Sequence, residues 1–107
     1  MPQIGIYCMS KAAVIHLTRR MATKLVKDNI NVTAIAPGAF ASDMNRAARD
    51  RADELAARIP AQRIGTAEDM AGVAIYLASR AGDYVVGNTI AVDGGVVYAN
   101  AGLEIAG

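Results

Sequence analysis

Tyr7 and Lys11 are the residues of this sequence whose types and spacing most clearly suggest chemistry. They lie four residues apart in Tyr7-Cys8-Met9-Ser10-Lys11, so a helix would place both side chains on one face, one turn apart. A neighbouring ammonium favours the phenolate, and we expect it to lower the tyrosine pKa from its ordinary value of about 10. Such a tyrosine can serve as a general acid or base. By itself, the pair also fits a partly exposed ring beside a solvated amine.

Further motifs follow this pair along the chain. They are the run Asn-Val-Thr-Ala-Ile-Ala-Pro-Gly over 31–38, Ser42-Asp43-Met44, the stretch from Arg63 to Asp69, and the stretch from Gly87 to Gly95. In this order the set resembles the carboxyl-terminal portion of the short-chain dehydrogenase/reductase family. Within that family it is most similar to 3-oxoacyl-[acyl-carrier-protein] reductase-like members. The resemblance covers nearly the whole chain, from Tyr7 to Gly95.

The resemblance implies an NAD(P)-dependent oxidoreductase that reduces a carbonyl or oxidises an alcohol by hydride transfer. Tyr7 would be the acid or base of this reaction. Lys11 would lower the tyrosine pKa and hydrogen-bond the ribose hydroxyls of the nicotinamide. Both residues would therefore contact the cofactor, which would be NAD or NADP, and the substrate would be a small carbonyl compound or alcohol.

The resemblance also implies a cofactor-binding loop after the strand that ends near residue 36. Pro37 and Gly38 would let the backbone approach the nicotinamide, because glycine has no side chain to interfere. Phe40 would offer its main-chain N–H to the carboxamide, while its ring packs. Ser42 stands where the family often has threonine in Pro-Gly-x-x-x-Thr, and it keeps a hydroxyl for the carboxamide or the phosphates.

Several parts implied by the resemblance are not in the printed sequence. Only six residues precede Tyr7, whereas the family's glycine-rich dinucleotide loop, Asn-Asn-Ala-Gly stretch and catalytic serine lie upstream of that tyrosine. We therefore expect the 107-residue chain to be inactive alone, and the choice between NAD and NADP stays open. The alternative is a non-catalytic oligomerisation or interaction module derived from the same family.

The elements that would position these residues follow from apolar patterning and turn residues. We expect residues 1–5 to form a loop, because Pro2 and Gly5 discourage regular structure. We expect Thr66 to cap the helix that begins near residue 66, with Asp69 at the capping-box distance. The predicted elements are a helix from about 7 to 27 that is buried on most sides, a strand at 30–36, a charged helical segment at 39–60, a helix beginning near 66, a strand at 89–92 and a turn at 93–95.

This order predicts an α/β fold, with helix, strand, helix, helix and strand in sequence. We interpret residues 1–107 as a single partial domain, the carboxyl-terminal part of a doubly wound, Rossmann-like parallel sheet. By the resemblance, residues 39–62 form a lid-like segment over the substrate. Two strands make a poor sheet by themselves, and an unpaired apolar strand edge invites association. We therefore predict a homo-oligomer.

Composition excludes several other classes of protein. Hydrophobic residues make up 53% of the chain and charged residues 20%, which is typical of a globular domain. The net charge of +1 leaves no basic stripe for nucleic acid, and no apolar run approaches the ~20 residues of a membrane span. His16 and Cys8 have no ligand partners at metal-site spacing, so no metal is expected. The single cysteine fits a reducing cytoplasm.

Overall fold

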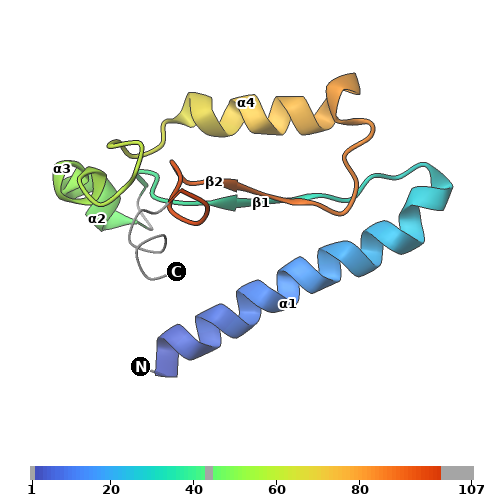
Figure 1. The fold of residues 1–107 in the computed structure, drawn as a ribbon, viewed down its shortest axis with the longest axis horizontal. Helices are drawn as coiled ribbons and strands as arrows, with labels where there is room; N and C mark the ends of the chain where they lie inside the picture. Colours follow the sequence, from blue (N-terminus) through green and yellow to red (C-terminus); the bar gives the residue numbers. More distant parts are fainter. Residues whose placement is uncertain (1, 43–44, 100–107) are drawn as a thin grey trace. The chain divides into compact units, whose positions relative to one another are not determined.

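Figure 1 shows the computed structural model of the chain, which describes the backbone of residues 2–42 and 45–99. Side chains are described within these ranges from Met9 onward, that of Ala47 excepted. The elements occur in the predicted order, which confirms the α/β class. They are α1 (Pro2–Leu25), the 3₁₀ turn η1 (Val26–Asp28), β1 (Ala34–Pro37), α2 (Arg46–Asp50), α3 (Ala52–Ala56), α4 (Ala67–Ala78), the 3₁₀ turn η2 (Arg80–Gly82) and β2 (Thr89–Val92).

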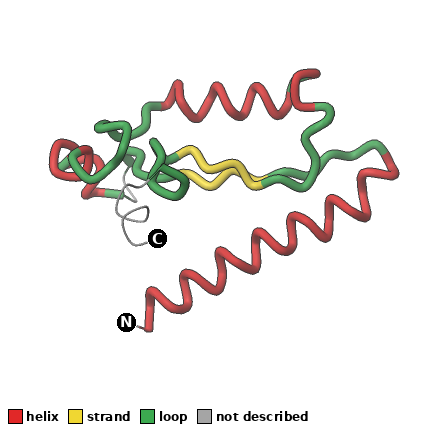
Figure 2. The backbone as a smooth tube through the Cα atoms, viewed as in Figure 1, coloured by secondary structure: helices red, strands yellow, loops and turns green. Residues whose placement is uncertain are grey.

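The two strands β1 and β2 form one hydrogen-bonded sheet and run side by side in the same direction (Figures 1 and 2). The amide of Ala34 donates to the carbonyl of Asn88 at 2.9 Å, and that of Gly38 donates to Val92 at 2.9 Å. Both partners advance together along the sequence, which is the register of a parallel pair. Helices α2, α3 and α4 make up the crossover, as parallel pairing requires.

The described residues group into two compact units, each taken by itself below. Residues 2–35 and 76–90 form the first unit, and residues 36–75 and 91–99 form the second, with 43 and 44 left aside. The strands β1 and β2 and the helix α4 each begin in one unit and end in the other. Small residues are prominent among the buried ones, with Ala22 in the first unit and Ala48 and Ile59 in the second.

Helix α1 begins at Pro2, so the prediction of a loop over residues 1–5 is wrong. Proline is tolerated in the first turn of a helix, because the N–H it lacks has no partner within the helix there. Gly5 lies inside α1 and costs about 1 kcal/mol relative to alanine. The 24-residue helix tolerates that local cost.

The apolar side chains of α1 stay largely exposed in the single chain, although we predicted a helix buried on most sides. Met9 is 73% exposed and Leu17 is 56% exposed, whereas Ala22 is buried. A chain of this length has too few elements to cover a long helix on several sides. Exposed apolar surface of this kind favours association with another protein surface.

The middle of the chain differs from its prediction in extent. The strand predicted at 30–36 is found at Ala34–Pro37, so it begins later and ends one residue beyond the predicted range. The helical segment predicted over 39–60 contains two five-residue helices, α2 and α3, followed by turns. In contrast, β2 lies where it was predicted, at Thr89–Val92. Across the described ranges, no helix combines the length and apolarity needed to cross a bilayer.

Candidate functional site

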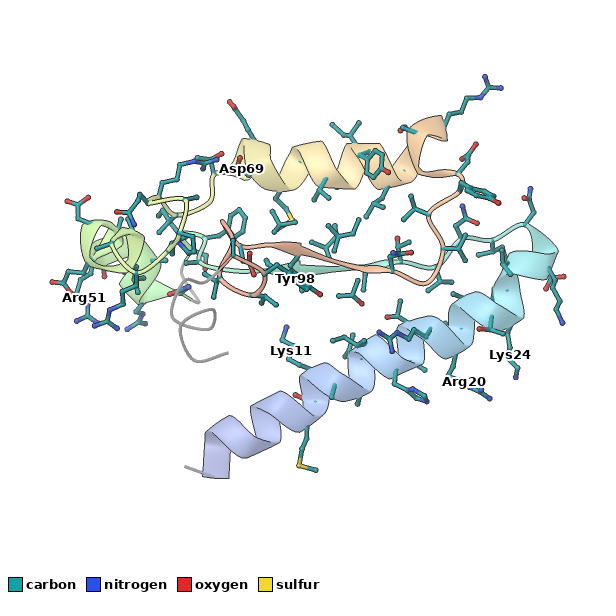
Figure 3. All side chains as sticks on the ribbon, in the orientation of Figure 1. Lys11, Arg20, Lys24, Arg51, Asp69 and Tyr98 are labelled. Carbon is teal, nitrogen blue, oxygen red and sulfur yellow. The ribbon has the colours of Figure 1, made fainter. Side chains whose placement is uncertain are left out.

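The predicted catalytic pair lies on the amino-terminal half of α1. Both Tyr7 and Lys11 fall within this helix, so their spacing places them one turn apart, as predicted. The Lys11 side chain is exposed and extends from α1 (Figure 3). The side chain of Tyr7 lies outside the described part of the structure, and so does that of Cys8. The chemical roles of Tyr7 and Lys11 remain predictions.

The carboxyl end of β1 carries Pro37 and Gly38. The amide of Gly38 donates to the carbonyl of Val92, and a Cβ atom placed on this glycine would lie 2.6 Å from Cβ of Asp93 and 2.8 Å from its Cα. A glycine is therefore required here by the neighbouring strand end. This packing reason adds to the predicted approach of a nicotinamide. Ligands of open α/β sheets bind at such carboxyl ends.

Ser42 begins the approach to α2. Its Oγ accepts a hydrogen bond from the amide of Asn45 at 2.9 Å, and Oδ1 of Asn45 accepts one from the amide of Ala48 at 3.1 Å. These bonds satisfy amide groups at the start of α2, which is the usual role of Ser and Asn before a helix. A hydroxyl that accepts can still donate its own hydrogen, and Ser42 is exposed.

Phe40 lies between Gly38 and Ser42 and packs against Gly65. The two residues form an isolated parallel bridge, and the amide of Gly65 donates to the carbonyl of Ala39 at 2.8 Å. A Cβ atom on Gly65 would overlap the Phe40 ring, with Cδ1 of the ring at 2.7 Å. The ring therefore occupies the space that a side chain at position 65 would need. This agrees with the predicted packing role of the ring.

Asp69 lies at the start of α4 (Figure 3) and pairs with Arg63. The Arg63 guanidinium donates to both carboxylate oxygens, from Nη1 to Oδ2 at 2.6 Å and from Nη2 to Oδ1 at 3.1 Å. The same Oδ2 accepts from the Thr66 amide at 2.8 Å, and the Asp69 amide donates to Oγ1 of Thr66 at 3.3 Å. The predicted capping box at Thr66 is thereby confirmed, with aspartate in the place more often held by glutamate.

These contacts lower the pKa of Asp69 well below its usual range. The largest cause is the hydrogen bond from Arg63, followed by those from the Thr66 amide and hydroxyl. The same bond to Asp69 raises the pKa of Arg63. All of these donors favour the ionised carboxylate.

We expect Asp69→Asn to remove a pH-dependent part of the chain's stability. Because the folded-state pKa lies below that of the unfolded chain, ionised Asp69 stabilises the fold above the ordinary aspartate pKa of about 4. That contribution is lost as the pH falls from there toward the lowered folded-state value. Urea unfolding followed by circular dichroism should therefore show the variant less stable at neutral pH and the two proteins converging in acid.

Two further variants give this expectation a scale and a control. Thr66→Ala removes the capping hydroxyl and should lower the free energy of unfolding by about 0.5–2 kcal/mol. Glu68→Gln removes the same charge from the adjacent residue of the first turn of α4, outside the capping box. An equal pH dependence in Asp69→Asn and Glu68→Gln would contradict the assignment to Asp69.

A cavity of about 350 Å³ lies within the second unit, at the carboxyl end of β2. Its lining includes Phe40, Ile59, Arg63, Asp93 and Tyr98. It adjoins the predicted turn at 93–95, where Oδ1 of Asp93 accepts from the Gly95 amide at 2.9 Å. Gly94 and Gly95 both have positive φ, of 68° and 98°, which glycine adopts without steric cost. The turn prediction is confirmed.

The structure divides the predicted site residues between the two units. Tyr7 and Lys11 share one helix of the first unit. The second unit holds Pro37, at the end of β1, and the loop that carries Gly38, Phe40 and Ser42. Sequence reasoning missed the contacts of Arg63 and Gly65, because their spacing to Asp69 and Phe40 follows no helix or strand period. Among the side chains described, no cluster of three or more His, Cys, Asp or Glu residues is arranged to hold a metal ion.

A helix with Tyr and Lys one turn apart, followed by a parallel βαβ unit with a loop at its strand end, makes the chain an α/β protein with part of an open parallel sheet. The family model described as Enoyl-(Acyl carrier protein) reductase matches residues 1–97. The chain belongs to the short-chain dehydrogenase/reductase family.

Individual relatives agree with this assignment. The chain is 52% identical over 96 residues to a 2-dehydro-3-deoxy-D-gluconate 5-dehydrogenase of Dickeya dadantii, a match that covers 87% of this chain and 38% of the relative. It is 43% identical over 91 residues to the 3-oxoacyl-[acyl-carrier-protein] reductase MabA of Mycobacterium tuberculosis, covering 84% of this chain and 37% of MabA.

A solved structure gives the same picture in three dimensions. The Pseudomonas aeruginosa RhlG/NADP active-site complex superposes with a TM-score of 0.75 at 48% identity, over 81% of this chain and 36% of RhlG. The present sequence thus spans less than two fifths of the length of each of these three relatives.

Proposed function

We propose that this chain forms part of an NAD(P)-dependent oxidoreductase that interconverts a carbonyl and an alcohol, with Tyr7 as the acid or base. The observation that carries the proposal is the placement of Tyr7 and Lys11 one turn apart on α1 of a short-chain dehydrogenase/reductase family member. The similar RhlG structure is a complex with NADP, which supports a nicotinamide cofactor for this chain without deciding between NAD and NADP. The bound nicotinamide would supply or accept the hydride.

The chain's own residues would hold the cofactor and move one proton. The Tyr7 hydroxyl would donate its proton to the carbonyl oxygen, and in the reverse direction the Tyr7 phenolate would take the proton from the alcohol. The Lys11 ammonium favours the phenolate by its charge and hydrogen-bonds the ribose hydroxyls. Both residues lie on one helix, so its backbone places them one turn apart.

The loop after β1 would hold the nicotinamide end of the cofactor. Pro37 and Gly38 place the backbone at the strand's carboxyl end, and Phe40 offers its main-chain N–H to the carboxamide. The exposed hydroxyl of Ser42 accepts from Asn45 and keeps its own hydrogen for the carboxamide or a phosphate. Within this loop, a hydroxyl and backbone amides are donors that suit an oxygen-rich ligand.

A second candidate function, a non-catalytic oligomerisation module, is favoured by the exposed apolar side chains of α1. Met9, Val14 and Leu17 are each more than half exposed in the single chain. We propose that these side chains contribute to a homo-oligomer in either case. Light scattering at micromolar concentration tests this, and a sharp monomer mass with a cooperative melt would contradict it.

The experiment that separates the two functions uses a protein that we call the chimera. It is the Dickeya dadantii relative with the segment it shares with this chain replaced by the present sequence. We expect the chimera to oxidise reduced nicotinamide with a small carbonyl substrate, and the assay should compare a 3-oxoacyl thioester with a keto sugar acid. A folded chimera that binds NADPH or NADH but turns over neither substrate class would favour the non-catalytic module.

A further inference from the structure

Residues 63–69 are held as a unit next to the loop after β1. The Arg63 guanidinium donates two hydrogen bonds to the Asp69 carboxylate, which also accepts one from the amide of Thr66. Nη1 of Arg63 also donates to the carbonyl of Ile64 at 3.2 Å. We call Arg63, Gly65, Thr66 and Asp69 the latch. Bidentate guanidinium–carboxylate pairs constrain geometry more tightly than single contacts do.

The latch contacts the loop after β1 through Gly65. The Gly65 amide donates to the carbonyl of Ala39, and the ring of Phe40 packs where a side chain at position 65 would lie. Arg63 lies before this glycine in the sequence and Thr66 follows it. Both are hydrogen-bonded to Asp69, so the backbone is held on each side of Gly65. Displacement of residues 63–66 would therefore act first on the backbone of residues 39 and 40. All of these residues belong to the second unit.

We propose that the latch is a positioning device for the loop over residues 37–42, which sets where the main-chain N–H of Phe40 stands. This inference rests on the proposed function of that loop in holding the nicotinamide. Arg63, Gly65 and Asp69 are positioning residues in this scheme and touch neither cofactor nor substrate. Their effect on binding passes through Ala39 and Phe40.

A purely structural capping role would have different consequences. A cap at Thr66 and Asp69 stabilises α4 whether or not the loop moves, so its loss lowers stability without a specific effect on the cofactor. A positioning role predicts that the cofactor KM rises while the protein remains folded. It also predicts that a rise in KM caused by a side chain at position 65 can be reversed by making the Phe40 side chain smaller.

The first test is a double-mutant cycle in the chimera. Gly65→Ala should raise the cofactor KM about tenfold to a hundredfold, because small misplacements of binding groups carry penalties of that size. Adding Phe40→Ala removes the ring that the new methyl group meets but keeps the main-chain N–H, and it should recover much of the lost affinity. Coupling between the two changes is what the cycle measures.

The second test needs no enzyme activity. In the 107-residue chain, Asp69→Asn should shift the amide-proton resonances of Gly65, Ala39 and Phe40. Glu68→Gln, which removes the same charge one residue away, should leave the Ala39 and Phe40 resonances in place. Arg63→Lys keeps the charge but loses the bidentate fork, and it should shift the same resonances as Asp69→Asn.

The outcomes distinguish this inference from the proposed function. An active chimera whose cofactor KM is unchanged by Gly65→Ala and by Asp69→Asn overturns the latch alone. The latch is also overturned if the amide-proton resonances of Ala39 and Phe40 do not shift in Asp69→Asn. A chimera without nicotinamide-dependent turnover overturns the proposed function, and the resonance shifts then decide separately whether the latch controls the loop. If Gly65→Ala does not fold, Asp69→Asn and Arg63→Lys carry the kinetic test.

Discussion

Tyr7→Phe in the chimera should lower kcat by about 10²–10⁴-fold, which is the usual contribution of a positioned general acid or base. The substitution removes one hydroxyl and keeps the ring, so the helix α1 should persist. The cofactor KM should change far less than kcat, because the proton transfer is made only in the transition state. Steady-state assays of reduced-nicotinamide absorbance at saturating cofactor measure this difference directly.

The matched control is Tyr84→Phe, the same chemical change at a fully exposed tyrosine outside the proposed site. It should leave kcat and both KM values unchanged. Far-ultraviolet circular dichroism should be the same for the parent and both variants. A chimera whose kcat survives Tyr7→Phe would contradict the assignment of Tyr7 as the acid or base, even if the family assignment stands.

The 107-residue chain alone should show no detectable turnover with a 3-oxoacyl thioester. Proton transfer by Tyr7 contributes only once the cofactor and the substrate are held in reacting geometry. In dinucleotide-binding folds the pyrophosphate rests on a glycine-rich turn at a helix amino terminus. The printed sequence contains no Gly-x-Gly-x-x-Gly stretch. We therefore also expect the chain alone to bind NADH and NADPH weakly.

The comparison that checks this is the chain against the chimera at equal concentration, with cofactor binding followed by nicotinamide fluorescence. The chimera should bind more tightly and turn over, while the chain alone should do neither. Robust turnover by the 107 residues alone would contradict the account in which cofactor binding needs a glycine-rich turn of a kind absent from the printed sequence. Proteolysis-resistant folding of both proteins is the necessary control for a negative result.

Local chemistry in the sequence determined several features correctly. The capping box at Thr66 and Asp69 and the turn at 93–95 depend on residues within a few positions of one another. The spacing of Tyr7 and Lys11 on α1 likewise needs only that the segment be helical. Side-chain-to-backbone bonds and helical periodicity act over one turn, so the residue types alone are enough to predict them.

Other features depended on contacts between distant segments. The sequence marked Gly65 only as part of the motif from Arg63 to Asp69. Its contact with Phe40 forms only because the chain folds back after α2 and α3. The need for glycine at position 38 comes from Asp93, which directly follows the neighbouring strand β2.

The physical reason for this division is the range of the interactions. Capping and turn formation are decided by hydrogen bonds within one short segment, whereas steric fit and strand pairing are decided by whichever segment the fold brings alongside. The pairing of Arg63 with Asp69 is an intermediate case, because it spans a loop whose shape depends on the bridge at Gly65. The residues proposed to do chemistry were therefore predicted from the sequence, and their roles stay predictions. The residues that hold the loop after β1 in place were evident only once the chain had folded.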